Sequence, residues 1–263
     1  MKIRSPRHIF RHGFTLMEVL VAMGVFLVLM TILLHFFSGA QTLWSGTDGK
    51  NELYADARVA MDLMANTLQS QYYEAGNSVF VFGTEQNKTN ALFFPVKMPE
   101  EYGSGENLYY LSFIWNPEQN GGLFLRTLGS RDNQSTYRNL FRPATESGCS
   151  HADKASALRS SLGYNADQSE LIIGGITELK ITPVIGGTPV TYADSVNDDY
   201  IAYAPFAVKI SMQMLGKQQF ETWKKLGGVM DSGGVKSGEP QPAKDFRLAN
   251  ARQFDRLVYL GFR

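Results

Sequence analysis

The sequence of 263 residues contains one cysteine and four histidines. A single cysteine excludes an intrachain disulfide, so an exported domain of this chain must rely on its hydrophobic core. Three of the histidines fall within the first 35 residues, which leaves His151 as the only imidazole in the rest of the chain. The sequence also lacks G-x-S-x-G, H-E-x-x-H and phosphate-binding glycine motifs. No enzyme activity and no cofactor are therefore predicted.

One catalytic alternative remains, formed by Cys149 and His151. On an extended segment these two side chains would share a face, and a Cys–His pair can make a nucleophile. Both residues lie in a serine-rich stretch with no orienting partner in sight. A loop without catalytic function is the simpler interpretation.

Charge is absent from a long stretch near the N-terminus. The 19 residues from Val19 to Phe37 contain no Asp, Glu, Lys or Arg. As a helix they would extend about 28 Å, close to the roughly 30 Å thickness of a bilayer's hydrocarbon core. Cleavable signal peptides have apolar cores of about 7 to 15 residues. The stretch therefore predicts a transmembrane helix.

Basic residues lie mainly on one side of this stretch. Four of them precede it within residues 1–13, and the next basic residue after it is Lys50. The positive-inside tendency predicts a cytoplasmic N-terminus and an exported remainder. Loss of residues 1–13 would leave 21 basic against 25 acidic residues, a formal charge of −4. Nucleic acid is therefore not an expected partner.

A carboxylate, Glu18, lies near the start of the apolar stretch. An ionised side chain costs roughly 2.5 to 3.5 kcal/mol at the bilayer centre and less near its edge, so a partner for Glu18 is expected. The alternative for this region is an exported soluble binding protein. In that case Ser38-Gly39-Ala40 would be a signal peptidase site and the mature chain would begin at Gln41.

The basic leader, Gly13, Phe14, Thr15, Leu16 and Glu18, followed by an apolar helix, resemble the N-terminal motif of type IV prepilins and type II secretion pseudopilins. Met17 departs mildly from the leucine or isoleucine common there. The resemblance implies that a prepilin peptidase cuts between Gly13 and Phe14, that Phe14 is N-methylated, and that Glu18 supports docking of the subunit.

The same resemblance implies the partners and the location. The partners are prepilin peptidase, other pilin or pseudopilin subunits and an inner-membrane assembly platform. The chain would be a single-pass inner-membrane protein with a periplasmic C-terminal head. It would be a minor structural subunit of a type II secretion or type IV pilus-like fibre.

Two looser resemblances concern the rest of the chain. The stretches Leu171–Ile181, Pro205–Ile210 and Phe254–Leu260 are similar in order and character to the closing strands of minor pseudopilins of the J type. The stretch Trp44–Lys50, followed by Asp56-Ala57-Arg58, is similar to the stalk of pilin-like cassette proteins of the Verrucomicrobia group.

Periodicity predicts an α+β fold in which a long N-terminal helix packs on an antiparallel sheet. The expected segments are a cleaved leader (1–13), a transmembrane helix (14–37), a continuing amphipathic helix (38–75) and a β-rich head (76–263). We expect a kink or break at Ser45–Gly49. The apolar stripe of the continuing helix comprises Leu53, Ala57, Ala60, Met61, Met64, Leu68 and Tyr72.

Within the head, short β-prone runs are separated by turn residues. Asn120-Gly121-Gly122 predicts a hairpin, and the aromatic run Tyr109–Trp115 predicts a strand covered on both faces or a partner surface. Helices are expected at 153–162 and 217–226, and an irregular, flexible loop at 227–242. The expected strands are 79–82, 92–96, 108–115, 123–128, 176–184, 206–214 and 257–260.

An acidic cluster offers the one conceivable metal site. Asp194, Asp198 and Asp199, with Asn197, carry oxygen ligands of the kind calcium prefers. Their spacing matches no EF-hand loop, so a solvated turn is the preferred interpretation and no metal is predicted.

Overall fold

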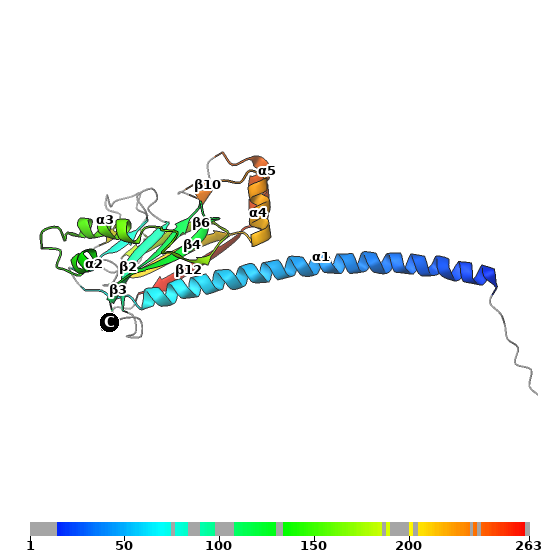
Figure 1. Ribbon diagram of the computed structural model, residues 1–263, viewed down its shortest axis with the longest axis horizontal. Coiled ribbons are helices and arrows are strands. Elements are labelled where there is room, and N and C mark those ends of the chain that lie inside the picture. The colour runs from blue at the N-terminus through cyan, green and yellow to red at the C-terminus, as the bar shows by residue number, and fades with distance from the viewer. Residues whose placement is uncertain are drawn as a thin grey trace, which may run out of the picture. The chain divides into compact units, whose positions relative to one another are not determined.

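The computed structural model describes residues 15–74, 77–83, 90–97, 108–129, 134–185, 188–189, 200–201, 205–231, 234–235 and 238–260. The chain divides into two compact units, residues 1–48 and residues 49–263. The second unit, called the head below, contains the sheets (Figure 1). It includes the C-terminal part of the first helix.

Helix α1 spans Leu16–Gln69. The break expected at Ser45–Gly49 is absent, because the helix includes these residues. The two glycines of this segment cost about 1 kcal/mol each in a helix, which a helix of 54 residues can absorb. The Thr47 hydroxyl donates to the Leu43 carbonyl at 2.9 Å, so its hydrogen bond is made within the helix. The helix ends before the expected residue 75 because the chain joins a sheet, where the Tyr72 N–H donates to the Pro95 carbonyl at 2.9 Å.

The larger sheet has six strands in the order β5-β4-β3-β2-β1-β8, and the pairs between them are antiparallel. The predicted hairpin joins β3 to β4, with positive φ at Asn120 (54°) and Gly121 (61°). Strand β5 was not predicted, because Glu-Leu-Ile-Ile shows no alternation of polar and apolar residues and the strand depends on its pairing with the distant β4. The strands are β1 (Phe80–Phe82), β2 (Ala91–Lys97), β3 (Leu108–Asn116), β4 (Gly122–Leu128), β5 (Glu170–Ile173) and β8 (Tyr200–Ile201).

A second antiparallel sheet has the order β12-β9-β6-β7. It comprises β6 (Ile176–Ile185), β7 (Thr188–Pro189), β9 (Ala207–Met214) and β12 (Arg252–Tyr259). Strand β12 begins five residues before the expected residue 257, and all eight of its residues pair with β9. Phe254 is the only apolar residue among the first five of the strand, so an argument based on apolar runs missed its start.

The main hydrophobic core lies between α1 and the two sheets. The predicted stripe from Leu53 to Leu68 is buried against side chains of both sheets, which confirms the α+β arrangement. Tyr72 lies beyond the helix end and is half-buried. Strand β3 is covered on both faces, since Phe113 belongs to the main core and Tyr110 to a second cluster that includes Leu158. Core packing therefore accounts for the aromatic run.

The described part of the head also contains four shorter helices: α2 (Gln134–Leu140), α3 (His151–Leu162), α4 (Lys217–Lys225) and α5 (Gln241–Asn250). Helices α2 and α3 lie together at one end of the sheets, and α4 and α5 lie side by side elsewhere (Figure 1). Helix α3 begins with a capping box between Ser150 and Asp153.

The segment expected as an irregular loop, 227–242, contains regular structure. Strands β10 (Met230–Asp231) and β11 (Gly234–Val235) pair within it, and α5 starts at Gln241. The sequence is rich in Gly and Pro, but a long-range contact orders it. Glu239 is buried, accepts a hydrogen bond from the Trp223 indole and forms an ion pair with Arg247 at 2.9 Å.

Candidate functional site

Thr15 and Glu18 together cap the N-terminus of helix α1. Glu18 Oε2 accepts hydrogen bonds from the Thr15 N–H at 2.9 Å and from the Thr15 hydroxyl at 3.1 Å. In return the Glu18 N–H donates to Thr15 Oγ1 at 3.3 Å. This reciprocal pattern is a capping box, in which two otherwise unpaired N–H groups at a helix start are satisfied. The T-x-x-E spacing of Thr15 and Glu18 could have predicted it.

The cap explains how a carboxylate is tolerated at the start of this apolar helix. The carboxylate lies in the first turn, where the helix dipole favours negative charge. Both bonds to Thr15 use the same oxygen, Oε2, and Oε1 takes none from the residues that the structure describes. A carboxylate can accept about four hydrogen bonds. Glu18 can therefore keep its local cap and still accept a donor from elsewhere.

The other two predicted site residues, Gly13 and Phe14, lie outside the described residues. The cleavage position, the methylation of Phe14 and a contact between its amine and Glu18 therefore stay predictions.

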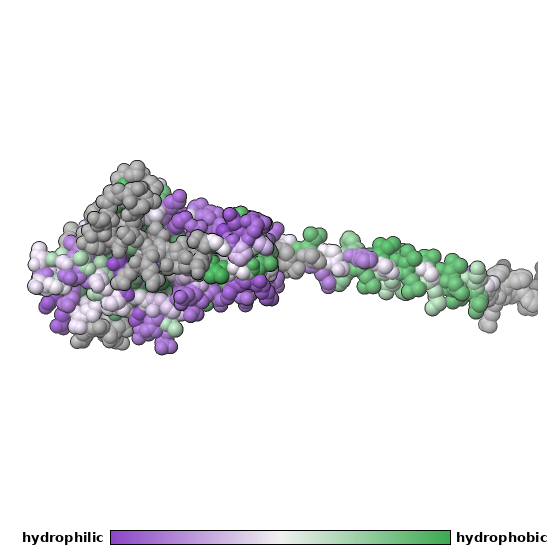
Figure 2. All heavy atoms as spheres, turned by 90° about the horizontal axis from the view of Figure 1, so that it is seen from above, coloured by the Kyte–Doolittle hydropathy of each residue, from purple (hydrophilic) through white to green (hydrophobic). Residues whose placement is uncertain are grey.

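The first part of α1 has the properties of a membrane segment. Leu16–Gln41 is long and apolar enough to cross a bilayer, and a stretch of 18 residues within it has a mean hydropathy of 2.6. All its side chains are exposed, and Figure 2 shows hydrophobic residues along this part of the helix and mainly hydrophilic ones on the head. The Thr31 hydroxyl donates to the Leu27 carbonyl at 2.8 Å. Its hydrogen bond is thus made inside the helix, as a lipid environment requires.

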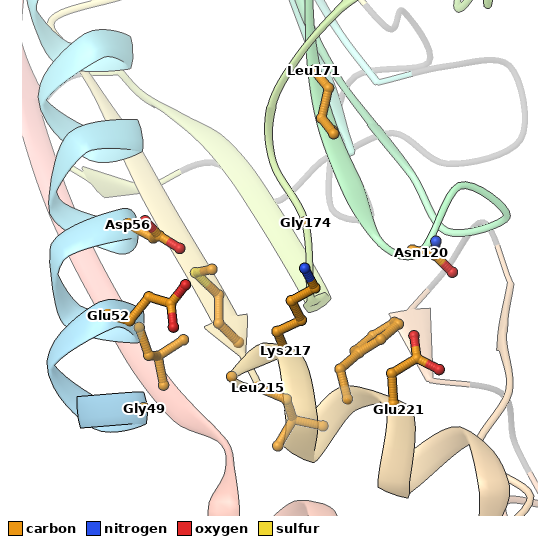
Figure 3. Close-up of a pocket in the computed structure, with 13 residues that line it drawn as sticks. Gly49, Glu52, Asp56, Asn120, Leu171, Gly174, Leu215, Lys217 and Glu221 are labelled. Atoms are coloured by element: carbon orange, nitrogen blue, oxygen red, sulfur yellow. The ribbon is translucent and has the colours of Figure 1, made fainter. Parts of the chain in front are cut away.

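The head contains a pocket of about 340 Å³ beside the head part of α1. Figure 3 shows Glu52 and Asp56 on α1, Glu221 on α4, and Lys217 between them. The lining residues include no histidine or cysteine. No group of three or more His, Cys, Asp or Glu side chains within the described ranges is placed to hold a metal ion. The charged residues that line the pocket are thus three carboxylates and one lysine.

The catalytic alternative gains no support from the placement of its residues. Cys149 is buried and therefore closed to a substrate, and His151 begins helix α3. Burial, with a smaller contribution from the Lys154 ammonium, lowers the pKa of His151. The weak calcium candidates Asp194, Asp198 and Asp199 lie outside the described residues.

Comparisons with known proteins identify the N-terminal segment. Residues 10–34 match the model of the prokaryotic N-terminal methylation motif. The chain is also 29% identical over 109 residues to the pilin-like protein PilA3 of Thermus thermophilus. That alignment covers 40% of this chain and 43% of PilA3, so the chain spans less than half of this relative's length. The methylation motif, the similarity to a pilin-like protein, the membrane-length helix and the antiparallel head together support a subunit of the type IV pilin and pseudopilin superfamily.

Proposed function

We propose that this chain is a minor, non-enzymatic structural subunit of a pilus-like fibre. Prepilin peptidase cuts between Gly13 and Phe14, and Phe14 becomes the methylated N-terminus. Before assembly, Leu16–Gln41 holds the subunit in the inner membrane, with the N-terminus cytoplasmic and the head periplasmic. One observation carries the proposal: the methylation motif at residues 10–34 coincides with the start of a membrane-length helix.

Glu18 has two successive roles in this proposal. In the free subunit it caps its own helix through Thr15. In the fibre its carboxylate also receives the Phe14 amine of a neighbouring subunit, because opposite charges attract strongly where water is excluded. Removal of one charge from such a pair leaves the other buried without compensation. The pair would therefore fix the axial register of each subunit as it enters the fibre.

The head supports a position among minor pseudopilins of the J type. The three stretches that resemble the closing strands of that type lie in β5 and β6, in β9 and in β12. Strands β6, β9 and β12 are neighbours in one sheet. We propose a place near the tip of a type II secretion pseudopilus, with a type IV pilus as the alternative. Deletion of the gene should stop release of secreted proteins in the first case and remove surface fibres in the second.

Co-expression with prepilin peptidase tests the processing step. The parent chain should become shorter, and Gly13→Leu should stay at full length because a side chain there obstructs the peptidase cleft. Gly24→Leu is the matched control, since a side chain added at Gly24 meets no atom within 4 Å. Shortening of Gly13→Leu to the parent's mature size would contradict the proposed site, because cleavage must then occur elsewhere.

A further inference from the structure

Two large apolar side chains stand beyond the membrane segment on α1. Leu43 is 76% exposed and Trp44 is 74% exposed, although polar residues flank them in the sequence at Gln41 and Thr47. They lie seven residues after Phe36 and Phe37, which is close to two helical turns. Trp44 therefore continues the side of the helix that carries Phe37.

The three tryptophans of the chain differ in their surroundings. Trp115 is 1% exposed and its indole N–H donates to the Ile176 carbonyl at 3.2 Å. Trp223 is fully buried and donates to Glu239. The indole of Trp44 is exposed and has no partner among the residues that the structure describes. Core packing and internal hydrogen bonds thus account for two tryptophans and leave Trp44 unexplained.

Helix geometry places Trp44 at the level of lipid headgroups. From Leu16 to Phe37 the helix is about 33 Å long, close to the roughly 30 Å hydrocarbon core of a bilayer. Trp44 follows about 10 Å later along the axis. Helical side chains point back toward the N-terminus, so the indole reaches back toward the membrane. The headgroup layers add about 5–8 Å on each side of the hydrocarbon core, so the Trp44 backbone lies just outside the outer layer and the indole enters that layer by reaching back.

We propose that Trp44 anchors the unassembled subunit in the outer-leaflet interface of the inner membrane. The inference rests on the proposed membrane insertion of Leu16–Gln41. Its ring contacts the upper acyl chains, and its N–H donates to lipid headgroup or ester oxygens, the environment that tryptophan favours in membrane proteins. Trp44 thereby sets how deeply the helix sits before it is drawn into a fibre. Continuity with the apolar segment selects lipid as its partner.

Quenching of tryptophan fluorescence tests this placement. The full chain is reconstituted into vesicles whose lipids carry bromine either just below the headgroup or near the acyl end. We expect strong quenching by the shallow bromines, weak quenching by the deep ones, and loss of both in Trp44→Phe. Trp115 and Trp223 are buried in the head and should not respond. A chain with Trp44→Phe and Val59→Trp is the matched control, because Val59 is an exposed α1 position in the head.

Flotation of the same vesicles separates the two proposals. A chain that floats and resists alkaline extraction, but whose Trp44 the shallow bromines do not quench, would overturn the anchor and leave membrane insertion standing. Equal quenching of Trp44 and of a tryptophan at residue 59 would also overturn it. A chain that does not float would overturn both the anchor and the membrane role.

Discussion

Helix α1 runs through two environments with opposite requirements. From Leu16 to Gln41 every side chain is exposed and most are apolar. In the head, the stripe from Leu53 to Leu68 is buried and the other side of the helix carries charged and polar residues. The first part depends on an external apolar solvent, and the second creates its own apolar environment by packing on sheets. Similar apolar side chains thus serve insertion in one part and folding in the other.

The largest effect should come from the one acidic residue of the membrane part. Glu18→Ala and Glu18→Gln should both be cleaved normally, because the scissile bond lies several residues upstream. Both should be largely lost from sheared fibres, measured as the fraction of subunit recovered there. Glutamine can complete the same capping box, so Glu18→Gln removes the charge and keeps the cap.

Thr15→Val is the complementary control for Glu18. It removes the hydroxyl that caps the helix and keeps the carboxylate, so the helix start should lose about 1 kcal/mol while assembly continues. If Glu18→Gln entered fibres as well as the parent, the charge-pair account would be wrong and the cap alone would explain the residue.

The next largest effect should come from a buried ion pair in the head. Glu239→Ala leaves Arg247 buried without its carboxylate and removes the acceptor of the Trp223 indole. The free energy of unfolding should fall by about 3–5 kcal/mol, measured by denaturant titration of the full chain in detergent. The control is Glu146→Ala, whose ion pair with Arg142 is half-exposed. Glu146→Ala should lower the free energy of unfolding by at most about 1 kcal/mol. If the two substitutions lowered it equally, the structural role of Glu239 would be contradicted.

A pair of identical substitutions on α1 sharpens the comparison of its two parts. Leu68→Ala, at a fully buried site, should lower the free energy of unfolding of the head by about 2–5 kcal/mol. Leu33→Ala, at a site 59% exposed, should leave it within about 0.5 kcal/mol of the parent. Chemical denaturation of both variants in the same detergent makes the measurement. A large loss for Leu33→Ala would show that the membrane part also contributes to the core.

The smallest effect concerns pH and is confined to the head. Complete burial raises the pKa of Tyr110, and the backbone of Val79 opposes that shift only in part. Above pH 10 the unfolded phenol ionises while the folded one stays neutral, so stability should fall as pH rises. Tyr110→Phe should remove this loss, measured as unfolding midpoints between pH 8 and pH 11.

The comparison of Tyr110→Phe with the parent isolates the contribution of the Tyr110 phenol to the change of stability with pH. Burial lowers the pKa of Lys154, so its contribution makes the stability of the head rise with pH below 10.5. This contribution is the same in the parent and in Tyr110→Phe. If Tyr110→Phe lost as much stability at alkaline pH as the parent, groups other than Tyr110 would be responsible.

Prediction from sequence succeeded where structure follows from local composition. The membrane segment, the apolar stripe of α1 and the long strands β2, β3, β4, β6 and β9 all carry continuous or periodic apolar runs. The β3–β4 hairpin was predictable because Asn120 and Gly121 adopt the positive φ angles that such turns require. These elements need no knowledge of distant partners.

The missed elements depend on contacts between distant parts of the chain. Strand β12 is a strand because it pairs with β9, and the segment around Glu239 is ordered by Trp223 and Arg247. In the candidate site, the proposed docking role of Glu18 followed from a resemblance, whereas its cap could have been predicted from the spacing of Thr15 and Glu18. The pocket beside α1 brings together residues from Gly49 to Glu221 and has no local signal.

Mass spectrometry of the mature N-terminus tests the central claim most directly. The chain is purified from membranes of cells that contain prepilin peptidase, and its N-terminal peptide is sequenced. The account predicts an N-terminus at Phe14 that carries one methyl group on its amine. A mature chain that begins at Gln41 would contradict it and identify an exported protein released by signal peptidase.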